Sequence, residues 1–233
     1  MDIITLIFMG LAVFVGWQLW SILGQTTGHE KPPRTPMGPP PTQEQIPANE
    51  NRRPADDPVG LSDLPINRWA GFAAAGSEQE DGLNAIARIE DDFNVAVFVE
   101  GAKAAYEMIV VAFARGDRQT LKEFVAKDVF ESFDQVLKER EQNGERAENT
   151  FVSIDKAKIS RVEVTDKTAF ITVAFQSKMI SYVQDQEGRI IEGNPGEVVD
   201  VADVWTFSRR LAQRDPNWSL VATEEGDSDQ PDA

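Results

Sequence analysis

Side chains that could do chemistry in this chain are mostly carboxylates, and few stand in patterns that catalysis uses. The chain has one histidine, His29, near its N-terminal end, and no cysteine. A Ser-His-Asp arrangement within a folded domain, a thiolate nucleophile and a Cys- or His-rich metal site are therefore excluded. The sequence also lacks a glycine-rich phosphate loop after a strand. We expect no cofactor and no metal.

Two carboxylate pairs are spaced so that they could share a proton or a cation. They are Asp91 with Asp92 and Asp200 with Asp203. The chain has 39 Asp and Glu against 23 Lys and Arg, a formal net charge of −16. An acidic, solvated surface is the interpretation we favour for both pairs. The same charge disfavours nucleic acid as a partner, because phosphate backbones reward basic surfaces.

An uncharged apolar run at residues 3–23 is the most distinctive stretch of the sequence. As a helix it would extend about 30 Å, the thickness of a bilayer's hydrocarbon core. A cleaved signal peptide would need a basic segment before the run and small residues after it, and neither is present. We therefore predict a single-pass anchor. The alternatives are a cleaved signal and a buried core helix.

Orientation of the predicted anchor follows from its short flanks. No Lys or Arg precedes the run, whereas Lys31 and Arg34 follow it. The positive-inside rule then places the N-terminus outside and the remaining chain on the cytoplasmic side of the membrane.

Composition changes sharply after the anchor. Residues 24–82 hold ten of the 13 prolines, which predicts an extended, disordered linker. Pro33 and Pro36 form a Pro-x-x-Pro sequence that a partner domain could read, although a simple linker is the favoured interpretation. An apolar island around Trp69 and Phe72 could dock on the domain or on a partner. The acidic tail, residues 226–233, is also expected to be disordered.

Periodicity between these segments predicts one α+β domain over residues 83–225. Small and apolar residues recur every three or four positions from Phe98 to Phe113, as in an amphipathic helix. Gly116 suits a left-handed helix end, and Asp117 is placed to cap the next helix. Beyond Thr150 the period falls to two, which predicts antiparallel strands that curve around the helices.

Two stretches of this domain resemble a known family. One is Phe-Val-Glu-Gly-Ala-Lys-Ala-Ala-Tyr-Glu at 98–107. The other combines Asp-Val-Trp-Thr-Phe at 203–207 with Asp-Pro-Asn-Trp-Ser-Leu at 215–220. Together they resemble the Tim44-like domain family, the family of the mitochondrial presequence-translocase motor anchor, and especially its bacterial membrane-tethered members.

The resemblance implies a cone-shaped fold similar to the nuclear-transport-factor-two superfamily, with a large apolar pocket between sheet and helices. We expect eight residues to contact a lipid or a protein partner: Phe98, Gly101, Ala102, Ala105, Tyr106, Phe113, Phe175 and Trp205. Mitochondrial relatives also recruit a chaperone through a charged N-terminal region. This chain has the apolar run and the prolines in that place, so we expect no such recruitment.

These observations predict a membrane adaptor rather than an enzyme. Its domain, held near the bilayer by the linker, would bind membrane lipid or subunits of an inner-membrane protein complex, in protein translocation or complex assembly. A ribosome receptor is the first alternative. A pocket enzyme is the second, and it would need a buried carboxylate with a shifted pKa beside Tyr106 or Tyr182.

Overall fold

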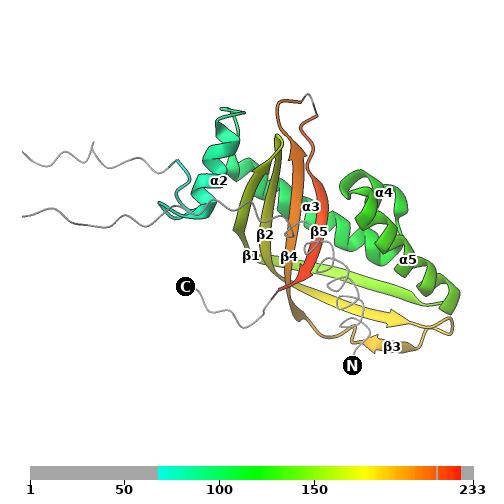
Figure 1. The fold of residues 1–233 in the computed structure, drawn as a ribbon. Coiled ribbons are helices and arrows are strands. Elements are labelled where there is room, and N and C mark those ends of the chain that lie inside the picture. The colour runs from blue at the N-terminus through cyan, green and yellow to red at the C-terminus, as the bar shows by residue number, and fades with distance from the viewer. Residues whose placement is uncertain (1–67, 214, 227–233) are drawn as a thin grey trace, which may run out of the picture.

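The computed structural model describes residues 68–213 and 215–226. Four helices come first and five strands follow, as Figure 1 shows. The helices are α2 (Glu78–Ala87), α3 (Val95–Arg115), α4 (Arg118–Phe124) and α5 (Lys127–Asn143). The strands are β1 (Arg146–Thr165), β2 (Thr168–Gln184), β3 (Ile190–Gly193), β4 (Val199–Arg210) and β5 (Ser219–Glu225). The predicted order of helices followed by an antiparallel sheet is confirmed.

Helix ends follow local sequence signals. Asn94 caps α3 by accepting hydrogen bonds from the backbone amides of Ala96 and Val97. The helix ends at Gly116, whose φ of 71° lies in the left-handed region. Asp117 then caps α4. Both of the predicted signals, at Gly116 and Asp117, are confirmed.

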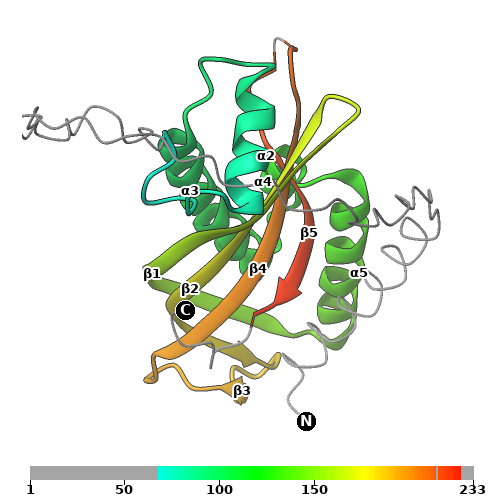
Figure 2. The same cartoon turned by 60° about the vertical axis from the view of Figure 1, so that its left-hand side comes forward.

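The sheet has the strand order β1-β2-β4-β5, with β3 paired to the end of β2. A tight turn at Asp166 and Lys167, both with positive φ, joins β1 to β2 and matches the right-handed twist of the pair. Three register shifts interrupt the long β1–β2 pairing. Bulges of this kind bend strands, and in Figure 2 the long strands curve around the helical layer.

The core lies between this sheet and the helices. On β2 the alternate residues Ala169, Ile171, Val173 and Phe175 are fully or almost fully buried, as period-two patterning requires. Opposite them, α3 presents a stripe at helical spacing that ends with Tyr106, Ile109 and Ala112. These two periodicities place the middle of α3 directly on β2 and β4.

The domain begins earlier than residue 83, which corrects the predicted linker boundary. Trp69 is only 2% exposed, and its indole donates a 2.9 Å hydrogen bond to Oδ1 of Asn84. Docking of the apolar island on the domain is thus confirmed for Trp69. The helix α2 packs so closely on the edge of β1 that a Cβ on Gly82 would lie 2.4 Å from the carbonyl oxygen of Val162. The free energy gained by burying the large indole of Trp69 offsets the conformational entropy lost when the chain before α2 becomes ordered.

Several predicted segments lie outside the described residues. These are the anchor at 3–23, the linker up to residue 67 and the tail from 227 onward. Within residues 68–213 and 215–226, no helix combines the length and apolarity needed to cross a membrane.

Candidate functional site

A cavity of about 370 Å³ opens between α3, α5 and the sheet. That volume lies within the range of small-molecule sites, roughly 300–1,000 Å³. Apolar side chains of α3, α5 and β2 form one part of its wall: Ile109, Val110, Phe113, Phe133, Val136 and Met179. Strands β4 and β5 supply both apolar and polar residues, among them Trp205, Asp203, Thr223 and Glu225, and further polar residues come from α5, β1 and β2.

A buried hydrogen-bonded trio adjoins the cavity. The Tyr106 hydroxyl donates to Oδ2 of Asp203 at 2.6 Å, and its oxygen lies 2.9 Å from Oγ of Ser177. Tyr106 is 0% exposed and Asp203 4% exposed. Burial raises the pKa of Tyr106, and the charge of Asp203 raises it further. The phenol therefore stays protonated and remains a donor.

Aromatic rings hold Tyr106 in this position. Its ring stacks on Phe175 with centroids 4.5 Å apart, and the Trp205 ring lies at 4.6 Å. The ring of Phe151 approaches edge-on at 6.0 Å. Because the phenol is fixed on three sides, its hydroxyl can reach the sheet only at Ser177 and Asp203.

Burial raises the pKa of Asp203 from 3.8 to about 6. Desolvation is the main cause. The hydrogen bond from Tyr106 and an interaction with the Trp205 indole lower the pKa, whereas the charge of Glu225 raises it. Holding this carboxylate ionised above pH 6 costs about 3 kcal/mol of folding free energy. A costly buried charge on a cavity wall is typical of a functional site.

The position of Asp203 corrects the interpretation of the acidic pairs as a solvated face. Asp200 fits that interpretation, since its side chain is 78% exposed and pairs with Lys178 at 3.0 Å. Asp91 and Asp92 are exposed as well. Asp203 instead lies at an alternate position of β4 with Trp205 and Phe207, so its side chain points to the same buried face as theirs. This alternation is visible in the sequence and could have indicated that Asp203 is buried.

Four further polar atoms of cavity-lining residues are buried without a hydrogen-bond partner. They are Oγ1 of Thr223, Oδ1 of Asn149, Nη1 of Arg140 and Nε1 of Trp205. Thr223 is 4% exposed. The Arg140 guanidinium stacks over the Phe113 ring at 4.7 Å, and burial lowers its pKa. Orphaned groups of this kind cost roughly 1–3 kcal/mol each unless a ligand or water satisfies them.

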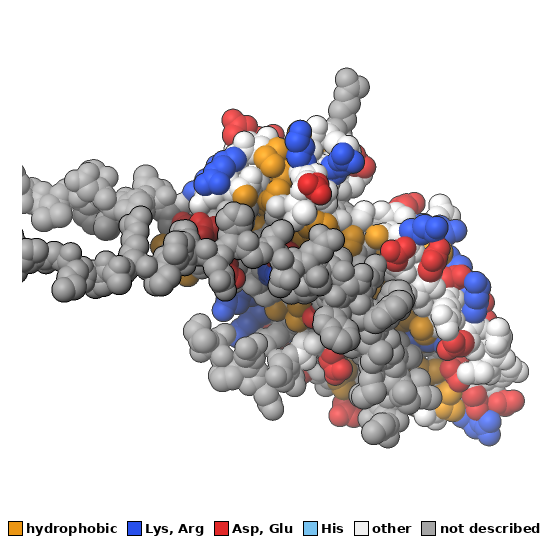
Figure 3. Space-filling model, viewed as in Figure 1, with side chains coloured by type: hydrophobic (Ala, Val, Ile, Leu, Met, Phe, Trp, Pro, Cys, Tyr) orange, Lys and Arg blue, Asp and Glu red, His pale blue; other side chains and the backbone are white. Residues whose placement is uncertain are grey.

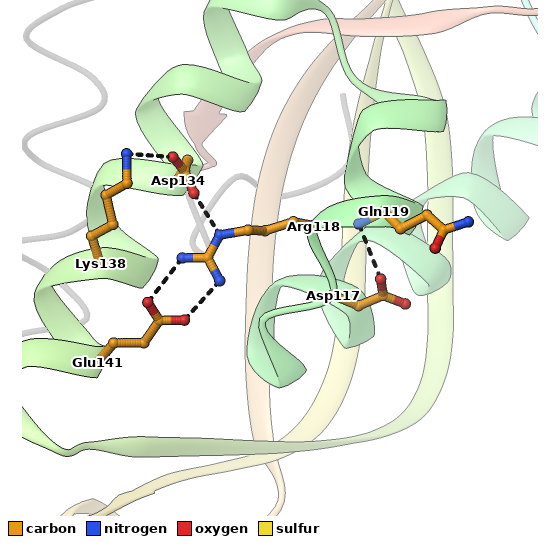
Figure 4. A network of polar contacts seen from close by, with 6 residues as sticks. All are labelled: Asp117, Arg118, Gln119, Asp134, Lys138 and Glu141. Carbon is orange, nitrogen blue, oxygen red and sulfur yellow. Dashed lines mark hydrogen bonds and ion pairs between the residues drawn. The ribbon is translucent and has the colours of Figure 1, made fainter.

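A charged network fixes α5, which carries one wall of the cavity (Figure 4). Arg118, the first residue of α4, donates through Nε to Asp134 at 2.6 Å. Its Nη1 and Nη2 donate to Glu141 at 2.7 and 3.2 Å. Lys138 contacts Asp134 at 2.7 Å. The carboxylates of Asp134 and Glu141, two turns apart on the same face of α5, are thus held by one planar guanidinium.

The eight predicted contact residues do not form one group. Phe113 and Trp205 line the cavity, and Tyr106 and Phe175 pack directly behind it. Phe98 lies in the same core but does not line the cavity, and its ring centroid is 4.7 Å from that of Trp218. Three small residues from the first half of α3 are elsewhere as well: Ala102 is buried, Ala105 half-buried and Gly101 exposed.

Together these features define an α+β domain of one sheet and packed helices, with an apolar cavity and an ionisable group on its wall. The model of the Tim44-like domain matches residues 79–225. The chain belongs to the Tim44-like domain family.

Relatives carry the same domain in longer proteins. An uncharacterized protein of Rickettsia prowazekii is 24% identical over 144 residues, which cover 62% of this chain and 58% of the relative. The human mitochondrial import inner membrane translocase subunit TIM44 is 18% identical over 148 residues, 62% of this chain and 33% of that protein. The chain therefore matches only part of each relative.

Among solved structures, the chain matches a putative dehydratase of the NTF2-like family from Streptomyces avermitilis at 18% identity. The match covers 56% of this chain and 96% of that protein's chain. The TM-score of this match is 0.30. The expected likeness to the nuclear-transport-factor-two superfamily stays a prediction.

Proposed function

We propose that the protein is a membrane-anchored adaptor of the bacterial inner membrane, acting in protein translocation or in assembly of a membrane complex. The observation that carries this proposal is the extent of the family match, residues 79–225, which is almost the whole described domain. Relatives with this domain are named as subunits of the mitochondrial import inner membrane translocase. The apolar run at 3–23 supports an anchor.

Surface charge also favours a protein or lipid partner. Acidic and basic side chains alternate over the face shown in Figure 3, with apolar groups between them. Among the described residues on this face the charges of mixed sign form no broad basic patch, and the net charge of −16 also disfavours a nucleic acid. An adaptor needs no catalysis, because tethering raises the local concentration of its domain at the membrane.

The cavity is the place where the domain would hold an apolar group. Its walls of Ile109, Phe113 and Phe133 fit a lipid chain or an apolar side chain of a partner. The first half of α3 offers a different contact, where exposed Gly101 leaves space for another backbone. Both uses are compatible with binding to a membrane assembly.

Site-specific photocrosslinking tests this proposal. A photoreactive residue at Val110, on the cavity wall, is compared with one at Glu107, which is exposed one turn earlier on the same helix. In intact membranes we expect Val110 to capture a lipid or an inner-membrane subunit that Glu107 does not. A variant that lacks residues 68–226 but keeps the anchor controls for capture by the anchor alone.

Loss of domain-dependent capture at every position would contradict the adaptor. Capture of ribosomal proteins, sensitive to salt, would instead support the ribosome receptor. Capture confined to lipid at Val110 would keep the cavity as a lipid site and would remove the support for a protein partner.

A pocket enzyme is the second candidate, because the structure contains the buried carboxylate beside a tyrosine that such an enzyme requires. Asp203 would act as the base, whereas Tyr106, fully buried behind the wall, would only hold it. The test is deuterium exchange of a small cyclic ketone in heavy water. Asp203 would take an α-proton from carbon and return a deuteron, and Asp203→Asn would stop the exchange.

A further inference from the structure

Four residues form a patch on one face of the β4–β5 pair. Asp203 stands directly opposite Glu225, and Trp205 stands opposite Thr223. Residues at alternate positions of a strand share a face, and directly opposed residues are roughly 5 Å apart at Cβ. All four line the cavity. The sheet therefore places two carboxylates, a hydroxyl and an indole together on its wall.

The two carboxylates of this patch have no cation. Neither Asp203 nor Glu225 forms an ion pair within residues 68–213 and 215–226, and the charge of Glu225 raises the pKa of Asp203. Like charges directly opposite one another destabilise a strand pair. Nearby Lys178 is engaged by Asp155 and Asp200. Glu225 is exposed to solvent whereas Asp203 is buried, so a cation that enters the cavity would lower the cost of ionising Asp203 above all.

Thr223 is an independent sign of a ligand at the patch. Its side chain is 96% buried, yet Oγ1 has no hydrogen-bond partner and lies on the cavity wall. Buried hydroxyls are normally satisfied. An occupant that donates a hydrogen bond would satisfy it along with the carboxylates.

We propose that the patch of Asp203, Trp205, Thr223 and Glu225 binds the protonated amino group of a ligand whose apolar part fills the cavity. This inference rests on the proposed use of the cavity for an apolar occupant, and it names the polar end of that occupant. The group is an alkylammonium, from either a lipid headgroup or a lysine side chain of a partner.

An ammonium fits the patch better than a metal ion does. It has three N–H donors, and the patch offers acceptors on Asp203, Glu225 and Thr223. The indole of Trp205 adds an aromatic wall that favours an organic cation. Hard divalent cations take six or more oxygen ligands, more than this patch supplies.

Arg140 is the cation that already lines the cavity, from α5. It stacks on Phe113, and the charges of Glu145 and Glu192 act on it. An anionic ligand would be drawn to Arg140 rather than to the patch. The sign of a ligand's charge therefore decides where its polar end binds: a cation at the patch, an anion at Arg140.

Binding should depend on pH through Asp203. Its carboxylate faces Tyr106 on α3 and Glu225 on β5, with Arg140 on α5 and exposed Asp200 on its own strand at the cavity. Below pH 6 protonation removes the charge of Asp203. The ammonium should then bind more weakly, while a neutral ligand of the same shape should bind equally well.

The test compares hexylamine, hexanol and hexanoate by calorimetry, with the full chain in phosphatidylcholine nanodiscs and empty nanodiscs as the blank. Near pH 7.5 we expect hexylamine to bind about tenfold more tightly than hexanol, as charge-assisted hydrogen bonds predict. The preference should fall below pH 6. Asp203→Asn should abolish it, and Asp92→Asn, at an exposed position that does not line the cavity, should leave it intact.

Several outcomes overturn the inference. One is equal affinity for hexylamine and hexanol, a second is tighter binding of hexanoate, and a third is a preference that survives in Asp203→Asn. Displacement of hexylamine by Mg²⁺ or Ca²⁺ would assign the patch to a metal. Failure of all three hexyl probes would instead contradict the proposed use of the cavity itself.

Two competition experiments identify the source of the amine. Phosphatidylethanolamine mixed into the nanodiscs weakens the apparent affinity for hexylamine if the natural ligand is a lipid headgroup. An N-acetylated apolar peptide with a single lysine competes if the ligand is a partner's side chain, and the same peptide with norleucine does not. Competition of either kind supports the amine site.

Discussion

Tyr106 on α3 donates a 2.6 Å hydrogen bond to Asp203 on β4, across 97 positions of sequence. The bond joins the longest helix to a central strand at the edge of the cavity. It also sets the ionisation of the carboxylate, since the phenol lowers a pKa that burial raises. The stability of the domain and the ammonium binding that we propose therefore depend on the same pair.

Asp203→Asn should stabilise the protein at high pH. The folded-state pKa of about 6 exceeds the ordinary value of 3.8, so the folded state binds protons more readily and the ionised carboxylate lowers stability as pH rises. The gain should be absent below about pH 4 and approach about 3 kcal/mol above pH 6. Thermal unfolding across this range measures it. A gain independent of pH would contradict burial of an ionised Asp203.

Tyr106→Phe should destabilise the protein, and more at pH 8 than at pH 5. The substitution removes a donor from Asp203 and a partner from Ser177, both buried. A lost buried partner costs about 1–3 kcal/mol, at the upper end when the acceptor is charged. Urea unfolding at both pH values measures the loss. Tyr182→Phe, on a half-buried position, is the matched control, and an equal loss at both pH values would argue against an ionised acceptor.

Two glycine-to-alanine substitutions in helices should change the stability of the domain in opposite directions. Gly82→Ala places a methyl group 2.4 Å from the Val162 carbonyl oxygen, so α2 must move off β1, at a cost of about 2 kcal/mol. Gly101→Ala meets nothing within 4 Å and should gain up to about 1 kcal/mol from helix propensity. Chemical unfolding of both variants tests this. Loss of stability in Gly101→Ala would show that the exposed face of α3 is covered.

Gly101→Ala also tests the predicted contact on α3. If a partner's backbone approaches this glycine closely, the added methyl group should reduce crosslinking to that partner while the domain becomes more stable. Unchanged crosslinking would remove Gly101 from the contact surface.

Arg118→Lys should lower the melting temperature and flatten its dependence on salt. A lysine cannot hold Asp134 and both oxygens of Glu141 at once. Hydrogen bonds from Lys138 and Arg118 lower the pKa of Asp134, so its contribution is present above pH 3.8 and is lost as pH falls through the folded-state value. Scans at several salt concentrations and pH values measure both effects, with exposed Lys127→Arg as the control.

Much of the fold was predictable because its signals are local. Gly116 and Asp117 mark a helix boundary through backbone rules, and the period of two from β1 onward marks strands. The sequence left open whether Trp69 docks on the domain or on a partner, because Trp69 follows a proline-rich stretch of low apolar content and its partner Asn84 lies 15 positions further along the chain. The free energy of burying this one indole is enough to order the segment around it, although the composition before it predicts disorder.

The cavity wall was harder to predict. Phe113 and Trp205 were identified as contact residues, because a resemblance to relatives pointed to them. Asp203 was assigned to the surface by the chain's overall acidity, although its inward parity on β4 indicated burial. Its pairing with Tyr106 and Glu225 depends on long-range register, which no local pattern specifies.

The docking of Trp69 and the close approach of Gly82 also determine how the domain bears mechanical load. A pull on the chain at Arg68 is resisted by the Trp69–Asn84 bond to α2, which packs on the edge of the 20-residue strand β1, and by hydrogen bonds from the Arg68 guanidinium to the backbone oxygens of Asp91 and Phe93. Extraction therefore begins with the loss of these contacts at one edge of the domain. The cavity, between α5 and the other ends of the long strands, would keep its shape while that edge yields.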